Sequence, residues 1–259
     1  MDRVLAFSLC LCLTLLAGCV HRHPTPGAQE YIEFMAAQTK IDAMNQRTLG
    51  SQAKPLTYSE KDIQQLADHI VLIQSNPFEL LQTSANLGFA PAQFELAKQL
   101  RVAALHDAAN RASLNANSCD LLKRAAASDL LIAALSVRAQ CADVSLARNL
   151  EEMLKAADDG YGVLVTVAAR KDPYAAFYPM KAFEPMSCVE SPTTEDGATQ
   201  PPMLTLDQAR AEAFYTSAMR EAKRTPAVAK QLGERALRAG CSAKAYAELL
   251  KVMAPQSAQ

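Results

Sequence analysis

Apolar residues recur at helical spacing along most of this chain, beginning near residue 30. Intervals of three and four residues place such positions on one face of a helix. Between 30 and 47 the stripe comprises Ile32, Met35, Ala36, Thr39 and Ala43. A second stripe, over 59–75, comprises Ile63, Leu66, Ala67, Ile70, Val71 and Ile73. We therefore predict two amphipathic helices, separated by a segment that contains Gly50 and Pro55.

Two helix pairs follow in the pattern. The segment 77–107 predicts two helices broken at Leu87–Phe89, with Pro91 opening the second, because proline is tolerated in the first helical turn. Residues 115–127 and 129–141 form another predicted pair. Each break is only a few residues long, so we expect the two helices of a pair to lie antiparallel as neighbours.

The helical pattern continues to residue 170, is interrupted over 172–205 and returns after that segment. We expect a helix over 144–158 and a short buried helix over the valine-rich 161–170, for which a strand is the alternative. From 172 to 205 prolines crowd together, which predicts an insert or long loop. Helical spacing returns over 206–254. The segment 30–171 is thus predicted to be a helical repeat region, and 206–254 the last helices of the same domain.

Composition agrees with a helical fold. Alanine is plentiful throughout, and only nine of the 259 residues are glycine. Alanine has the highest helix propensity, and its small side chain lets helices approach closely. The chain is therefore predicted to be all-α, with antiparallel helix pairs that form a short, irregular α-solenoid.

Four aromatic residues gather at the start of the predicted insert. They are Tyr174, Phe177, Tyr178 and Phe183. We expect these rings to pack against the last helices of the chain, and an aromatic contact patch for a partner is the alternative.

The amino-terminal segment is the most apolar part of the sequence. Its apolar run, 4–17, is shorter than the roughly 20 residues that a bilayer span needs, but it suits a secretory signal. It closes on the letters LAGC, ending at Cys19, which resemble the lipobox of bacterial lipoproteins. The resemblance implies that 1–18 is a signal peptide, that Cys19 carries the lipid and that 19–29 is a tether. Val20, in place of an aspartate, implies the outer membrane, facing the periplasm.

Four cysteines remain after Cys19, and an even number in an oxidising compartment predicts two disulfides. Three pairings are possible. Two of the four lie at similar distances before and after the predicted turn at Ser128, so they should reach similar heights on antiparallel helices. We favour Cys119–Cys141 and, by elimination, Cys188–Cys241, and four free buried thiols are the alternative.

The stretch SANLGFAPAQFELA has small residues at intervals of three, four and four, namely Ala85, Gly88, Ala92 and Leu96. It resembles the Sel-one-like repeat, a relative of the tetratricopeptide repeat. Weaker echoes occur around Ser128, Gly160 and Gly240, so the pattern is degenerate. The resemblance implies stacked helix pairs with a curved face that binds a peptide or a partner helix. An unrelated alanine-rich helical domain is the alternative.

The sequence contains few candidate catalytic or metal-binding residues. His69 and His106 each adjoin an aspartate, but neighbouring residues on a helix point about 100° apart and do not form an acid–base couple. The carboxylate pairs at 151–152 and 158–159 suit solvated helix faces. His21 and His23 lack further metal ligands nearby. We therefore predict no catalytic residue, cofactor or metal site, and the formal net charge of −1 argues against a nucleic-acid partner.

These patterns favour a non-enzymatic adaptor. It would hold an envelope protein or peptide, for example in secretion or pilus assembly, while the lipid on Cys19 attaches it to the membrane. The competing hypothesis is a cell-envelope enzyme, such as a cell-wall hydrolase, whose site is assembled from distant residues. A purely structural envelope protein without a groove is a third hypothesis. A broad groove would favour the adaptor, whereas a pocket with convergent Glu, Asp or His would favour the enzyme.

Overall fold

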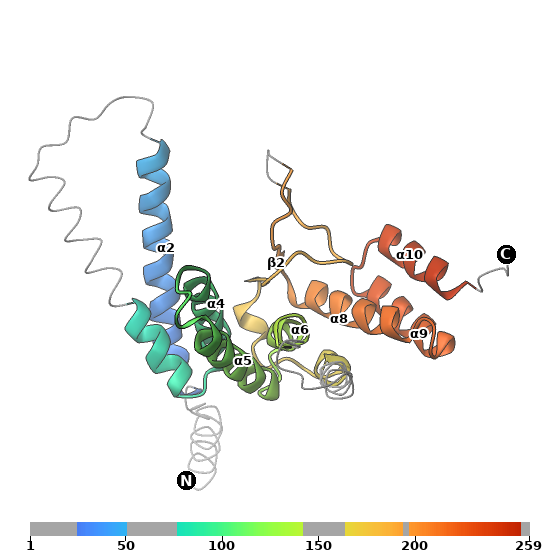
Figure 1. Cartoon of the computed structure of the whole chain (residues 1–259), viewed down its shortest axis with the longest axis horizontal. Helices are drawn as coiled ribbons and strands as arrows, with labels where there is room; N and C mark the ends of the chain where they lie inside the picture. Colours follow the sequence, from blue (N-terminus) through green and yellow to red (C-terminus); the bar gives the residue numbers. More distant parts are fainter. Residues whose placement is uncertain (1–24, 51–76, 142–163, 194–196, 255–259) are drawn as a thin grey trace, which may run out of the picture.

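The computed structural model of the chain is mostly helical (Figure 1). It describes residues 25–50, 77–141, 164–193 and 197–254. Consecutive helices pack as antiparallel pairs, which confirms the predicted all-α class. Several predictions fall outside the described residues: the signal peptide, Cys19 and most of the tether, the helices expected over 59–75 and 144–158, and the turn at Gly160.

The helices follow one another along the molecule (Figure 1). In chain order they are α2 (Ala28–Gly50), the helical residues 77–86, α4 (Ala90–His106), α5 (Arg111–Ala127), α6 (Leu131–Gln140), the helical residues 164–169, α8 (Leu206–Glu221), α9 (Pro226–Arg238) and α10 (Ala243–Met253). Packing runs from α4 to α5, α5 to α6, α6 to α8, α8 to α9 and α9 to α10. One apolar core extends through this row of helices.

The insert lies between α6 and α8 in sequence and contains little regular structure. Its elements are the short 3-10 helix η2 (Ala175–Phe177) and the two-residue strands β1 (Met180–Lys181) and β2 (Met203–Leu204). The strands are antiparallel, with Met180 opposite Leu204. Both of these side chains are buried. The insert is therefore packed into the body of the protein, whereas the proline pattern left open whether this segment is an insert or a long loop.

The first predicted repeat turn has the expected geometry. The helix over 77–86 ends, Gly88 takes φ +88°, and α4 begins at Ala90 with Pro91 in its first turn. The N–H of Phe89 donates to the carbonyl oxygen of Ser84 at 3.2 Å, which satisfies the end of the preceding helix.

The same turn recurs twice. Leu130 N–H donates to Ala125 O at 3.2 Å, and Cys241 N–H donates to Ala236 O at 3.0 Å. The left-handed position is Asp129, with φ +65°, in the former and glycine in the latter. In the weaker echo around Ser128, the left-handed residue is thus the next one along the chain. Aspartate tolerates this conformation better than most residues, because its short polar side chain can hydrogen-bond locally.

The buried face of α2 also differs from the predicted stripe. Ile32 and Met35 are 51% and 44% exposed, whereas Tyr31 and Phe34 are buried. The Tyr31 ring lies 5.4 Å from that of Phe89, centroid to centroid, so α2 rests on the repeat through its aromatic residues. Aromatic rings bury a large apolar area and pair with other rings, so the contact with Phe89 favours this face.

Both disulfides favoured by the sequence are present. Cys119–Cys141 joins α5 to the end of α6, with Cα atoms 5.4 Å apart. Cys188–Cys241 joins the insert to the turn between α9 and α10, with Cα atoms 5.0 Å apart. The two bonds thus fasten one helix pair and the middle of the insert.

Candidate functional site: a groove between α4 and the insert

A buried carboxylate holds the start of the insert. Asp172 is 3% exposed, and its Oδ2 accepts hydrogen bonds from Leu131 N–H at 3.3 Å and from the Tyr178 hydroxyl at 3.1 Å. Its Oδ1 accepts from Tyr174 N–H at 2.7 Å. The Tyr178 hydroxyl oxygen in turn accepts from Ile132 N–H at 3.2 Å. The insert therefore supplies the N-terminal hydrogen bonds of α6, whose own N-cap residue provides none.

A second buried carboxylate holds the middle of the insert. Glu212 on α8 accepts hydrogen bonds from Ser187 N–H at 3.1 Å and Cys188 N–H at 2.8 Å. Ser242 N–H donates to Cys188 O at 3.0 Å beside the disulfide. Glu212 thus binds the backbone of the insert, and Asp172 links the insert to the start of α6, so both carboxylates have a structural role.

The aromatic residues of the insert face the first helices. Phe177 and Tyr174 meet Phe89 edge-on, with ring centroids 5.1 and 5.5 Å apart. Phe183 meets Phe94 of α4 at 5.3 Å. The expectation that these rings pack on the last helices is wrong. Their positions bring the insert alongside α4 and leave a groove between the two.

This groove is a cavity of about 480 Å³. It is lined on α4 by Lys98, Arg101, Val102, Ala104 and Leu105, on α5 and α6 by Arg111, Asn115 and Gln140, and on the insert by Lys181, Ala182, Phe183 and Pro201. The lining residues within the described ranges are apolar, amide or cationic, and they include no aspartate, glutamate or histidine.

One face of α4 forms the floor of the groove. Lys98, Arg101, Val102 and Leu105 recur at the three- and four-residue intervals that place side chains on one helical face. Val102 and Leu105 are 56% and 73% exposed, while the other face of α4 enters the core. Two large apolar side chains therefore lie open to solvent beside two cations.

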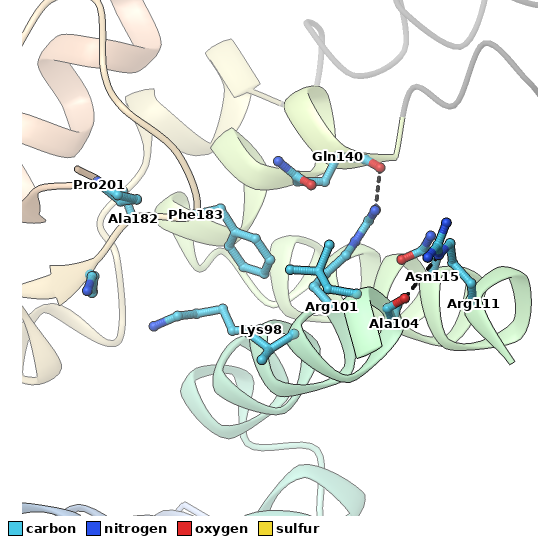
Figure 2. A pocket seen from close by; sticks show the side chains of 12 residues that line it. Lys98, Arg101, Ala104, Arg111, Asn115, Gln140, Ala182, Phe183 and Pro201 are labelled. Carbon is cyan, nitrogen blue, oxygen red and sulfur yellow. Dashed lines mark hydrogen bonds between the residues drawn. The ribbon is translucent and has the colours of Figure 1, made fainter. Parts of the chain in front are cut away.

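Backbone carbonyls hold the two arginines in place (Figure 2). Arg101 donates to the carbonyl oxygen of Gln140 at the end of α6. Arg111 Nε donates to Ala104 O at 3.1 Å. A carbonyl is neutral, so the bond to Ala104 orients the Arg111 guanidinium without cancelling its charge.

The other two cations lie on the opposite side. Lys98 extends toward Ala182 and Pro201, away from Arg111 (Figure 2). It forms an ion pair with Glu95 at 3.0 Å. Lys181 is exposed. Both lysines also line a neighbouring cavity of about 380 Å³, which reaches α2 and includes Glu95 and Asp42.

The side chains whose pKa values are raised lie outside the groove lining. Burial raises the pKa of Glu184, with a further rise from Glu212 and an opposing effect from Arg138, but Glu184 lines neither cavity. Burial, and then the nearby Asp172 carboxylate, raise the pKa of Tyr178. Within the described ranges, no cluster of His, Cys, Asp and Glu has the makeup of a metal site.

Comparisons with protein-family models, curated proteins and solved structures give no match. The likeness to the Sel-one-like repeat and to the lipobox therefore remains a prediction from the residues themselves. Of the predicted site residues, the structure places the four disulfide cysteines, and Cys19 lies outside its described ranges.

We did not predict the groove from the sequence, although the residue pattern along α4 indicated one of its walls. The spacing from Lys98 to Leu105 marks a second, basic and apolar face of α4. The opposing wall gave no such signal, because tertiary contacts of the insert, among them the hydrogen bonds of Asp172 and Glu212, bring Lys181 and Phe183 to the groove.

Proposed function

We propose that this protein is a non-enzymatic adaptor that holds a segment of a partner protein in the groove between α4 and the insert. The observation that carries the proposal is the exposed face of α4, where Val102 and Leu105 lie in a cavity large enough for several side chains. Exposed apolar surface rimmed by polar groups is typical of interaction sites. In the part of the chain that the structure describes, the groove lining holds arginine, lysine and amide groups and no pair of carboxylates, which favours binding over hydrolysis.

We further propose that Cys19 anchors the adaptor to the periplasmic leaflet of the outer membrane. The support is the lipobox-like sequence that ends at Cys19, and Val20 after it. Two disulfides suit an oxidising compartment. Within the described ranges, no helix is both long enough and apolar enough to cross a bilayer.

The test is affinity purification from envelopes of the native host after mild cross-linking. Leu105→Glu should abolish recovery of the partner, because it places a charge on the floor of the groove. The matched control is Leu250→Glu on α10, another exposed leucine, which should recover the partner normally. Cys19→Ala should lower recovery by releasing the protein from the membrane. Equal yields from the native chain and Leu105→Glu would rule out the groove as the binding site.

A further inference from the structure

We propose that the segment held in the groove is an acidic peptide whose carboxylates alternate with apolar side chains. This inference rests on the proposed function, because it names the chemistry of the partner at the same site. It follows from the charges around the groove, from their separation and from the apolar surface between them.

The charged side chains that line the groove are all positive. Among the residues that the structure describes, its lining contains two lysines and two arginines and no carboxylate. Lys98 is partly neutralised by Glu95. Arg111 and Lys181 form no ion pair with any other residue that the structure describes. The formal net charge of the whole chain is only −1, so this excess of cations is local. A partner of opposite charge would be guided to it.

The cations are spread out and do not converge on one point. Lys98 and Arg111 lie at opposite ends of the groove, with Arg101 between them (Figure 2). Along α4, Lys98 and Leu105 are separated by roughly 10 Å, at 1.5 Å per residue. A single phosphate or lipid headgroup would reach one cation and leave the others unmatched. An extended peptide advances about 3.3 Å per residue, so a few residues can carry carboxylates to both ends.

The apolar floor determines what lies between those carboxylates. Val102 and Leu105 are exposed beside the cations, and Phe183 forms part of the facing wall. Apolar side chains of the peptide would cover this surface and gain about 25 cal/mol per Å² of area removed from water. A purely acidic chain would leave it uncovered, so the groove fits an acidic segment that also carries leucine-like side chains.

The experiment measures binding of labelled synthetic peptides to the full, oxidised chain by fluorescence anisotropy. The probe has about twelve residues of alternating glutamate and leucine, and its matched control has glutamine for every glutamate. We expect the acidic peptide to bind at least about tenfold more tightly, with the difference shrinking as salt rises from about 50 to 300 mM. Lys181→Gln and Arg111→Gln should each weaken the acidic peptide by about three- to tenfold.

Lys223→Gln is the control variant, because it removes an exposed lysine that lines neither cavity. It should leave binding unchanged. Leu105→Glu should abolish binding of both peptides. Circular dichroism would verify that every variant keeps the helical fold.

Each remaining outcome overturns the inference. Equal affinity for the acidic and glutamine peptides, with both lost in Leu105→Glu, would leave a groove that binds peptides but has no preference for acid; the proposed function would then stand alone. Binding of neither peptide would refute the acidic segment, and the envelope purification would decide the proposed function separately. Direct binding of phosphatidylglycerol vesicles that depends on Lys181 and Arg111, without peptide binding, would assign the groove to an anionic lipid.

Discussion

The carboxylate of Asp172 lies at the start of helix α6, where its Oδ2 accepts a hydrogen bond from the backbone N–H of Leu131 at 3.3 Å. The two residues are far apart in sequence, and this contact ties the beginning of the insert to the second helix pair. The other side of the insert is tied to α8 by Glu212 and to the α9–α10 turn by the Cys188–Cys241 disulfide. These contacts hold Lys181 and Phe183 in position across the groove from α4.

Loss of the Asp172 carboxylate should destabilise the protein. Asp172→Ala leaves the N–H groups of Leu131 and Tyr174 without this acceptor, and we expect the free energy of unfolding to fall by about 2–4 kcal/mol. Asp207→Ala is the control, since that carboxylate is 76% exposed and pairs only with Arg210, and it should cost less than about 1 kcal/mol. Urea unfolding measures both, and similar losses in the two variants would show that Asp172 does not hold the insert.

The left-handed turn positions should respond in opposite directions to substitution. Gly88→Ala should lower the free energy of unfolding by about 1–2 kcal/mol through backbone strain. A Cβ at Gly88 meets nothing within 4 Å, so packing adds no further cost. Asp129→Gly should raise stability by about 0.5 kcal/mol, because glycine relieves strain at φ +65° while only a surface ion pair with Arg170 is lost. Thermal unfolding checks the signs, and a stabilised Gly88→Ala would refute the shared turn geometry.

Gly233 controls how closely α9 and α10 approach. An added Cβ there would lie 2.4 Å from Leu249 Cδ2 and 3.0 Å from Tyr246 Cε2. Alanine normally stabilises a helix by about 1 kcal/mol relative to glycine, but we expect Gly233→Ala to destabilise by about 1–3 kcal/mol through overpacking. Adding Leu249→Ala should make the Gly233→Ala substitution favourable. A double-mutant cycle by urea unfolding measures this coupling, and additive effects would mean that the two helices are not in close contact.

Stability should fall at alkaline pH in part through Tyr31. Burial, with a further contribution from the Glu95 charge, raises the pKa of this phenol in the folded chain. Tyrosine in the unfolded chain ionises near pH 10, so the folded state loses stability as pH rises above about 10. Below that pH both states are protonated and the contribution is fully present. Tyr31→Phe should therefore flatten the decline between about pH 9 and 12 in urea unfolding, and a parallel decline in both proteins would show that Tyr31 does not titrate this way.

The sequence predicted what depends on local pattern. Helical spacing and proline placement located α4 and the helical segment 206–254, and the turn beside Ser128 led to the Cys119–Cys141 pair. The local pattern did not determine which apolar face of α2 is buried, because the buried face depends on contacts with Phe89 and Phe177 from distant segments.

The insert shows the same limit more strongly. Prolines indicate irregular backbone, and they carry no information on whether that backbone is loose or packed. Its packing depends on Asp172, Glu212 and Phe183 finding partners tens of residues away. The spacing of residues along α4 thus indicated one wall of the groove, whereas the other wall forms through contacts between segments that are distant in sequence.

The groove can be examined in living cells with a photo-reactive benzophenone amino acid placed at position 105 or, for comparison, at position 250. Both positions hold exposed leucines on helices, so each can receive the bulky side chain without unfolding the protein. If the groove holds a partner, light should produce a discrete cross-linked protein from position 105, which is lost when Lys181 and Arg111 are both changed to glutamate, and none from position 250. The same adducts from both positions, or none from position 105, would contradict the assignment of this groove as the site where the protein holds its partner.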